Sequence, residues 1–346
     1  MTSTSPRPLQ VLGWRPWLAT TVTTLVLTAT TILAVGCVPR FPAPRVEVAG
    51  TDEQVARGQY LATHVTICIT CHSVRDWSFY GGPTTPGTEG LGGPTHPDFF
   101  RLPADVVLPS PNITQEGVGS WTDGELIRAI SGGLRADGAA LFPAHPYFQL
   151  RRMPREDLEA IVAYLRTLEP GSVALPTRDL VYALARDIGN TLPLPPQPKK
   201  AVPKPGSVES GAYLAEVGNC KWCHTPTDTM GWPILGQEFQ GGAGFLVPAP
   251  GGGRVFSSNL TPHPTGLGSW TREVFIARFK NATPEAIRSS TVQEGAFNSP
   301  MNWAAYSGMT EQDLGAIYDY LSTLRPRNNP VTPWVPGEGG SALLSD

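Results

Sequence analysis

The chain contains the pattern Cys-x-x-Cys-His twice, as CITCH over 68–72 and as CKWCH over 220–224. Two thiols at this spacing can each form a thioether with one vinyl group of a porphyrin, and the His that follows lies under the iron as its proximal ligand. The pattern therefore predicts two covalently attached haem c groups. The attachment and proximal residues would be Cys68, Cys71 and His72 in the first motif and Cys220, Cys223 and His224 in the second.

Zinc binding or thiol redox chemistry is the alternative interpretation of each Cys pair. A structural zinc ion takes four ligands, so a single zinc site would join both pairs and leave no use for both histidines. Each His directly follows its second Cys, as haem attachment requires. We therefore favour haem for both motifs.

The two motifs occupy corresponding places in an internal repeat. Matching blocks in one order indicate duplicated domains, a stronger signal than a single motif. We expect domains at 51–170 and 208–326, called here the first and second repeat, a linker at 171–207 and a tail at 327–346. Besides the motifs, the matching blocks are GQYLA (58–62) with GAYLA (211–215), NIT (112–114) with NLT (259–261), GSWT (119–122) with GSWT (268–271), and 153–170 with 309–326.

The last block of each repeat predicts an amphipathic helix. Apolar residues recur there at the three- and four-residue spacing that buries one helix face. Pro170 and Pro326 are expected to stop the two helices. The GxYLA blocks predict a first helix in each repeat, whose Gly permits close approach of another helix. The apolar stripes are Leu158, Ile161, Val162, Leu165 and Leu168, and Leu314, Ile317, Tyr318, Leu321 and Leu324.

The order of these elements is typical of class I cytochrome c: a first helix, CxxCH, a loop-rich middle and a final helix carrying Tyr-Leu. The expected fold is mainly α, with two tandem class I cytochrome c domains joined by a Pro-rich linker. Residues 191–207 (TLPLPPQPKKAVPKPGS) should form a semi-rigid extended connection that sets the distance between the domains. The Pro- and Gly-rich tail is expected to be loosely ordered.

The second iron ligand of a class I domain comes from the loop before the last helix. Met301 is the candidate in the second repeat, and the alignment that pairs Met153 with Met309 places His145 opposite Met301. We expect His145 and Met301 to be the two ligands, and Met153 and Met309 to be packing residues. The alternatives are Met153 as the first ligand, and a vacant first iron with His145 on a surface loop. Because a Met ligand raises the reduction potential, the first haem should have the lower potential.

Both repeats resemble the diheme cytochrome c proteins related to the cytochrome subunits of bacterial membrane-bound dehydrogenases. The resemblance runs from about Gly58 to Pro326 and is carried by the repeated blocks and by FPAHPY (142–147). This family usually has Met in a Pro-x-Met-Pro-Tyr-like loop, where the chain has His145. The resemblance implies electron transfer from a dehydrogenase or quinone-linked donor toward an oxidase or a soluble cytochrome. An Asn and a Trp recur in both repeats, as Asn112 and Trp121 in the first and Asn259 and Trp270 in the second. We expect them to line the haem pocket or contact the propionates, with simple core packing as the alternative.

The N-terminal region resembles a bacterial export segment. Residues 1–17 carry Arg7 and Arg15 without an acid, and 18–36 are apolar and small. LAVGC (33–37) resembles a lipobox, which would make Cys37 a lipidated N-terminus; an uncleaved membrane anchor is the alternative. We expect 1–36 to be the signal or anchor, 37–50 to be a tether, and the body to lie at the periplasmic face of a bacterial cell envelope, attached to the membrane.

Composition agrees with two globular domains rich in loops. The chain has 346 residues, 40% hydrophobic residues, 37 Gly and 36 Pro. A net charge of -3 does not suggest nucleic acid. We expect an electron carrier that is not itself an enzyme, such as the electron-transfer subunit of a dehydrogenase complex. A diheme peroxidase with one open haem is the alternative, which a ligand at His145 argues against. A thiosulfate-oxidising enzyme would need a cysteine ligand, and no Cys remains for it.

Overall fold

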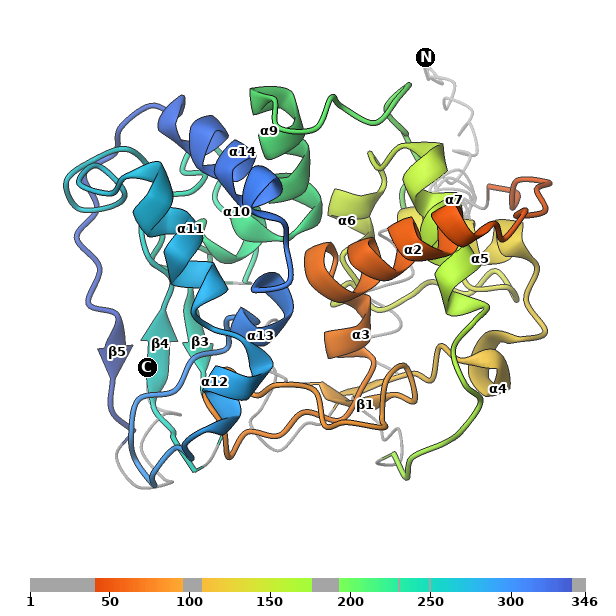
Figure 1. Cartoon of the computed structure of the whole chain (residues 1–346), viewed down its shortest axis with the longest axis horizontal. Coiled ribbons are helices and arrows are strands. Elements are labelled where there is room, and N and C mark those ends of the chain that lie inside the picture. Colours follow the sequence, from red (N-terminus) through yellow and green to blue (C-terminus); the bar gives the residue numbers. More distant parts are fainter. Residues whose placement is uncertain (1–40, 96–107, 176–192, 230, 249, 338–346) are drawn as a thin grey trace, which may run out of the picture. The chain divides into compact units, whose positions relative to one another are not determined.

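The computed structural model describes residues 41–95, 108–175, 193–229, 231–248 and 250–337 (Figure 1). Cys37, the proposed export or anchor segment 1–36 and the start of the expected tether lie outside these residues. Within the described parts of the chain, no helix combines the length and apolar character needed to cross a membrane. Phe41–Asp346 form one compact unit.

The first repeat is built from short helices around a small β-ribbon. Its first helix, α2, begins at a capping box in which the Thr51 hydroxyl accepts from the Gln54 amide and the Gln54 side chain accepts from the Thr51 amide. Strands β1 and β2 pair antiparallel. The elements are α2 (Asp52–Tyr60), the π-helical turn η1 (Leu61–Val65), α3 (Cys68–Cys71), β1 (Gly93–Thr95), β2 (Leu108–Ser110), α4 (Gln115–Val118), α5 (Asp123–Gly132), α6 (Tyr147–Leu150) and α7 (Arg155–Leu165).

The second repeat has the same order of a first helix, a CxxC helix, a β-ribbon and a final helix. Its ribbon gains a third strand, β5, from the expected tail, so the sheet has the antiparallel order β3-β4-β5. The tail is therefore ordered as far as this strand. The elements are α9 (Val208–Val217), α10 (Cys220–Cys223), β3 (Gly244–Leu246), β4 (Arg254–Phe256), α11 (Arg272–Lys280), α12 (Pro284–Arg288), α13 (Trp303–Tyr306), α14 (Glu311–Ser322) and β5 (Trp334–Val335).

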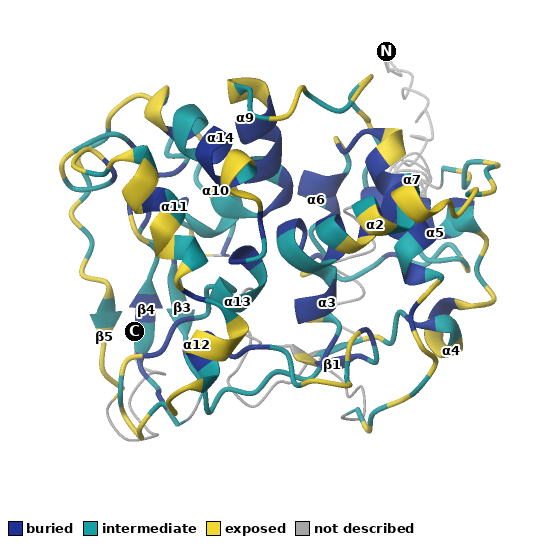
Figure 2. Cartoon of the chain, viewed as in Figure 1, coloured by how far each residue is buried: buried dark blue, intermediate teal, exposed yellow. Residues whose placement is uncertain are grey.

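The mainly helical class is confirmed, and the short sheets are additional. The predicted final helices are present as α7 and α14, and they end before the prolines, at Leu165 and Ser322. Leu158, Ile161 and the rest of the first stripe are at most 8% exposed. Figure 2 shows these helices with buried faces turned toward their neighbours.

The first and last helices of each repeat pack against each other, α2 on α7 and α9 on α14. A Cβ at Gly58 would collide with the backbone of Ala160 in α7, and a Cβ at Gly211 would collide with Ala316 in α14. The predicted role of these two glycines in close helix approach is thus confirmed. Only a residue without a side chain lets the two backbones come this near.

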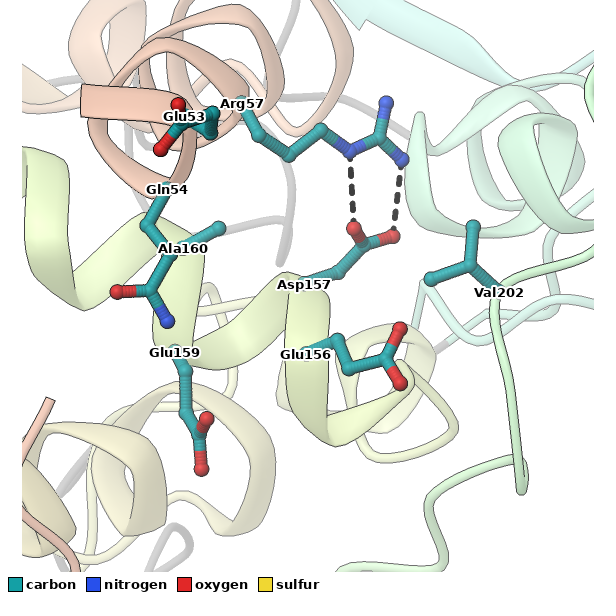
Figure 3. A pocket seen from close by; sticks show the side chains of 8 residues that line it. All are labelled: Glu53, Gln54, Arg57, Glu156, Asp157, Glu159, Ala160 and Val202. Atoms are coloured by element: carbon teal, nitrogen blue, oxygen red, sulfur yellow. Dashed lines mark hydrogen bonds and ion pairs between the residues drawn. The ribbon is translucent and has the colours of Figure 1, made fainter. Parts of the chain in front are cut away.

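Direct hydrogen bonds join the two repeats. The Tyr213 hydroxyl on α9 donates to Asp157 Oδ2 on α7 at 2.6 Å, and the Tyr60 hydroxyl on α2 donates to Asp313 Oδ2 on α14 at 2.5 Å. The two contacts are reciprocal, because Tyr60 aligns with Tyr213 and Asp157 with Asp313. Arg57 completes the first contact by pairing with Asp157, as Figure 3 shows. The distance between the repeats is therefore set by side chains as well as by any linker.

The segments flanking the first repeat are also packed. Val46 and Val48, in the expected tether, pack against the core, and the Val48 amide donates to Asp123 Oδ2 at 2.9 Å. Residues 193–207 of the expected linker contain no helix or strand. They run along the first repeat, where the amides of Gln197 and Lys199 donate to the carbonyls of Arg151 and Arg152.

Candidate haem-binding site

Each Cys-x-x-Cys segment forms one helical turn that starts after a left-handed residue. Ile67 (φ 53°) precedes α3, and Asn219 (φ 62°) precedes α10. Asn tolerates this conformation, whereas a β-branched Ile adopts it at a cost of about 1–3 kcal/mol. The helical turn then places the two Cys of each motif three residues apart on one face, with His at its end. The structure thus gives both motifs the same local geometry.

The two motif histidines are held by backbone carbonyls. His72 Nδ1 lies 2.7 Å from the Pro111 carbonyl oxygen, and His224 Nδ1 lies 2.8 Å from that of Ser258. Burial lowers the pKa of both rings, against the opposing effect of these bonds. A neutral ring whose Nδ1–H donates to a carbonyl keeps Nε2 as a free lone pair, which is how metal-binding histidines are commonly oriented.

The loops that supply these carbonyls are fixed by the recurring asparagines. Asn112 Oδ1 accepts from the Thr114 amide at 2.8 Å, and Asn259 Oδ1 accepts from the Thr261 amide at 2.9 Å. Each Asn directly follows the residue whose carbonyl meets the His. Such side-chain turns stabilise a loop locally. These residues therefore act as loop supports, and the repeated Asn-x-Thr block was the sequence signal that pointed to them.

The thiols are uncharged. Burial raises the pKa of Cys68 to about 11 and that of Cys220 to about 12. Burial also raises the pKa of Cys223 to about 12, with smaller effects from the nearby Cys220 and from Cys71 of the other motif. The second cysteines of the two motifs therefore lie within electrostatic range of each other, which sequence alone did not indicate.

His145 lies within electrostatic range of His72. Burial lowers the pKa of His145 to about 3, with a smaller contribution from the positive charge that His72 has when protonated. Its Nδ1 is buried without a hydrogen-bond partner. A buried polar atom that the protein leaves unpaired is costly, so it points to a group outside the chain. The neutral imidazole beside His72 fits a haem iron.

Met301 is partly buried against the core, in the loop that precedes α13. Its amide donates to Ser299 Oγ at 3.2 Å, and its carbonyl accepts from the Trp303 amide at 2.9 Å. Met153 and Met309, by contrast, are 0% and 3% exposed within the core. Met153 and Met309 are therefore packing residues of the core, whereas Met301 is only partly buried and lies in a loop.

Two further buried donors without a partner lie two residues after the candidate ligands: the Tyr147 hydroxyl and Trp303 Nε1. Burial raises the pKa of Tyr147, so it remains a neutral donor. The two propionates of a haem accept hydrogen bonds, so a bound haem would offer partners to these two donors. Sequence reasoning missed both, although their shared spacing from His145 and Met301 was visible. Together with the oriented histidines, these features fit haem c in both repeats.

Comparison with known proteins agrees with this fit. The chain is 30% identical over 286 residues to the cytochrome c subunit of a quinone alcohol dehydrogenase from Gluconacetobacter polyoxogenes, covering 79% of this chain and 56% of the relative. Other relatives of the chain are likewise cytochrome c subunits of bacterial dehydrogenases. The fructose dehydrogenase cytochrome subunit of Gluconobacter japonicus is 26% identical over 323 residues, covering 90% of this chain and 60% of the relative.

A diheme c-type cytochrome of Cereibacter sphaeroides is 28% identical over 219 residues, covering 62% of this chain and 69% of that protein. The resemblance to cytochrome subunits of bacterial membrane-bound dehydrogenases is thus confirmed, and covalently bound haem c follows from it. No family model matches the chain. The chain spans little more than half the length of the two dehydrogenase subunits, at 56% and 60%.

Proposed function

We propose that this protein is a diheme c-type cytochrome that transfers electrons and has no substrate of its own. One haem would be attached in each of two tandem domains, 51–170 and 208–326, joined by the Pro-rich linker 171–207. The observation that carries the proposal is the pair of equivalent Cys-x-x-Cys-His turns, each with its His Nδ1 held by a carbonyl. When bound, haem c supplies an iron that takes up and releases one electron.

The iron ligands of the proposal are His72 with His145 and His224 with Met301. His72 and His145 lie within electrostatic range of each other, and Met301 occupies the loop aligned with that of His145. Imidazole is the better donor to ferric iron, and Met raises the potential. The first haem is therefore expected at the lower potential, and electrons would rest on the second.

The relatives suggest partners and a place in the cell. As electron-transfer subunits of membrane-bound dehydrogenases, they support a dehydrogenase or quinone-linked donor for this chain, with an oxidase or soluble cytochrome as acceptor. The body would then lie at the periplasmic face of the cell envelope. Cys37, if lipidated, or an uncleaved N-terminal helix would attach it to the membrane.

Optical spectroscopy of the reduced and oxidised protein tests the proposal. A carrier with four filled ligand positions should not bind carbon monoxide rapidly at either haem. The oxidised protein should show one near-infrared sulfur-to-iron band, since only one iron has a Met ligand. Two such bands would contradict the ligand His145.

Rapid carbon monoxide binding at one haem would instead favour the diheme peroxidase, which needs an iron with an open face. Hydrogen peroxide turnover by the purified protein, measured in parallel, would decide for that enzyme. The partly buried position of His145, whose Nδ1 has no hydrogen-bond partner, supports the carrier.

A further inference from the structure

The loop that carries Met301 is held by a segment of the other repeat. Asn298, three residues before Met301, has a side chain with 0% exposure. Its Oδ1 accepts from the Gly81 amide at 2.8 Å and from the Ser299 amide at 2.7 Å. One buried oxygen thus joins the Met301 loop to Gly81, a residue that follows the first haem motif.

Gly81 belongs to a braced segment, residues 75–84, which we call the bracing loop. Arg75 donates from Nε to the Gly82 carbonyl at 2.7 Å and from Nη2 to the Gly81 carbonyl at 2.6 Å. The Arg75 guanidinium also stacks over the Trp77 ring at 4.2 Å. These contacts fix the backbone on which the Gly81 amide is presented to Asn298.

The bracing loop touches the second repeat along its length. The Val292 amide donates to the Ser78 carbonyl at 2.8 Å, and Phe79 forms a β-bridge with Thr291. Arg288 donates to the Thr84 carbonyl. The bracing loop therefore contacts the second repeat at several points from Ser78 to Thr84, and Asn298 is the fully buried residue among its partners.

Gly81 also lies directly against the candidate ligand. A Cβ at this position would be 3.1 Å from the Met301 carbonyl oxygen and 3.5 Å from Trp303 Cδ1. The position aligned with Asn298 in the first repeat is Phe142, which has no amide side chain. We call the hydrogen bond between the Asn298 side chain and the Gly81 amide the clamp. Phe142 cannot make an equivalent side-chain contact next to His145.

We infer that Asn298 is a positioning residue that, with the bracing loop of the first repeat, holds Met301 in place as ligand of the second haem. The first repeat then controls the ligation of the second haem without itself supplying a ligand to that iron. This inference rests on the proposed Met301 ligand. A Met in a loop needs such support, because its flexible side chain adds little rigidity of its own.

The Asn298→Leu variant of the haem-loaded protein tests the clamp. Leu has the same branching and the same number of side-chain heavy atoms as Asn, but it leaves the Gly81 and Ser299 amides without their acceptor. The near-infrared sulfur-to-iron band should be lost or greatly weakened, and the potential of the second haem should fall while that of the first is unchanged. Hydrogen exchange at the Gly81 amide should accelerate about tenfold. Asn281→Leu, at an exposed residue of the same repeat, is the control and should change none of these.

A matched pair in the first repeat tests the same clamp from the other side. Gly81 and Gly87 both have left-handed backbones, at φ 75° and 81°, but a Cβ at Gly87 meets nothing within 4 Å. Ala at either position carries similar backbone strain. Gly81→Ala should disturb the sulfur-to-iron band of the second haem, and Gly87→Ala should not. This pair decides the matter if Asn298→Leu does not fold.

The outcomes separate this inference from the function on which it rests. If the native band is missing, or survives in Met301→Leu, the Met301 ligand itself is wrong. If the band depends on Met301 but remains at full strength, with unchanged potential, in both Asn298→Leu and Gly81→Ala, the clamp is overturned. Loss of the band in Gly81→Ala but not in Gly87→Ala supports it.

Discussion

At the scale of single residues, the two repeats differ most where His145 stands opposite Met301. Each lies in a loop before a short helix, α6 or α13, that precedes the last helix of its repeat, and one offers a nitrogen where the other offers a thioether sulfur. The two motif histidines are held alike, since His72 and His224 make the same bond to a carbonyl at 2.7 and 2.8 Å. A difference in potential between the haems should therefore originate mainly at His145 and Met301.

Replacing His145 with Met should raise the potential of the first haem and bring the two potentials closer together, because both irons would then have a sulfur ligand. A redox titration followed by absorbance measures this shift, and a second near-infrared band should appear. Met301→His is the reciprocal variant and should lower the second potential. Unchanged potentials in both variants would argue that neither residue binds iron.

Each cysteine pair should account for one covalent haem. Replacing Cys68 and Cys71 with Ala should leave one haem, on the second motif, and replacing Cys220 and Cys223 should leave the other. Mass spectrometry of the mature protein counts the attached groups directly. Native protein without covalent haem would end the cytochrome assignment.

These residues were predictable because a short linear pattern encodes them. The carbonyls of Pro111 and Ser258 were not, because any residue has a carbonyl and only the fold decides which one meets a His ring. The same limit applies to Asn298. Its partner Gly81 is 217 residues away, and no local pattern links them.

At the scale of elements, helix pairing was predictable and the contacts between repeats were not. The stripes on α7 and α14 and the glycines of α2 and α9 are local signals, and the structure confirms both. The strands have two or three residues each, too few to show a period of two. Tyr60 and Tyr213 are equivalent positions of the two repeats, and so are Asp157 and Asp313. Each Tyr bonds to the Asp of the other repeat, and only the tertiary structure determines that pairing.

Removing the Tyr213 hydroxyl should weaken the contact between the repeats. In Tyr213→Phe the buried Asp157 would keep Arg57 but lose a hydrogen bond of 2.6 Å, so the free energy of unfolding should fall by about 1–3 kcal/mol. Tyr60→Phe should cost less, because Tyr60 and Asp313 are both only partly buried. Urea unfolding measures both. A larger loss in Tyr60→Phe would contradict this ranking.

At the scale of the whole molecule, the two repeats act as parts of one unit. Residues from both contribute to the same hydrophobic cluster, and Cys71 lies within electrostatic range of Cys223. Direct contacts between the repeats would keep the distance between the two motifs constant, which suits transfer of an electron between them. The sequence predicted two domains but could not show that they share a core. The apolar stripe of each final helix could equally have been buried entirely against residues of its own repeat.

The N-terminal boundary of the folded body decides how a soluble form should be made. Val46 and Val48 pack on the core, the Val48 amide binds Asp123, and a Cβ at Gly132 would collide with the Phe41 ring. A protein that starts at Phe41 behind a cleavable signal should therefore be soluble and carry both haems. One that starts at Ala49 loses these contacts and should unfold at lower urea concentration.

The full chain should stay with the membrane after a salt wash and be released by detergent, as should be checked by fractionation. Cys37→Ala then separates the two anchors, since it abolishes a lipid attachment and leaves an uncleaved helix unaffected. If the full-length protein washes off with salt alone, membrane attachment through the N-terminus is wrong. If the forms starting at Phe41 and Ala49 unfold at the same urea concentration, residues 41–48 are a tether after all and contribute nothing to the folded body.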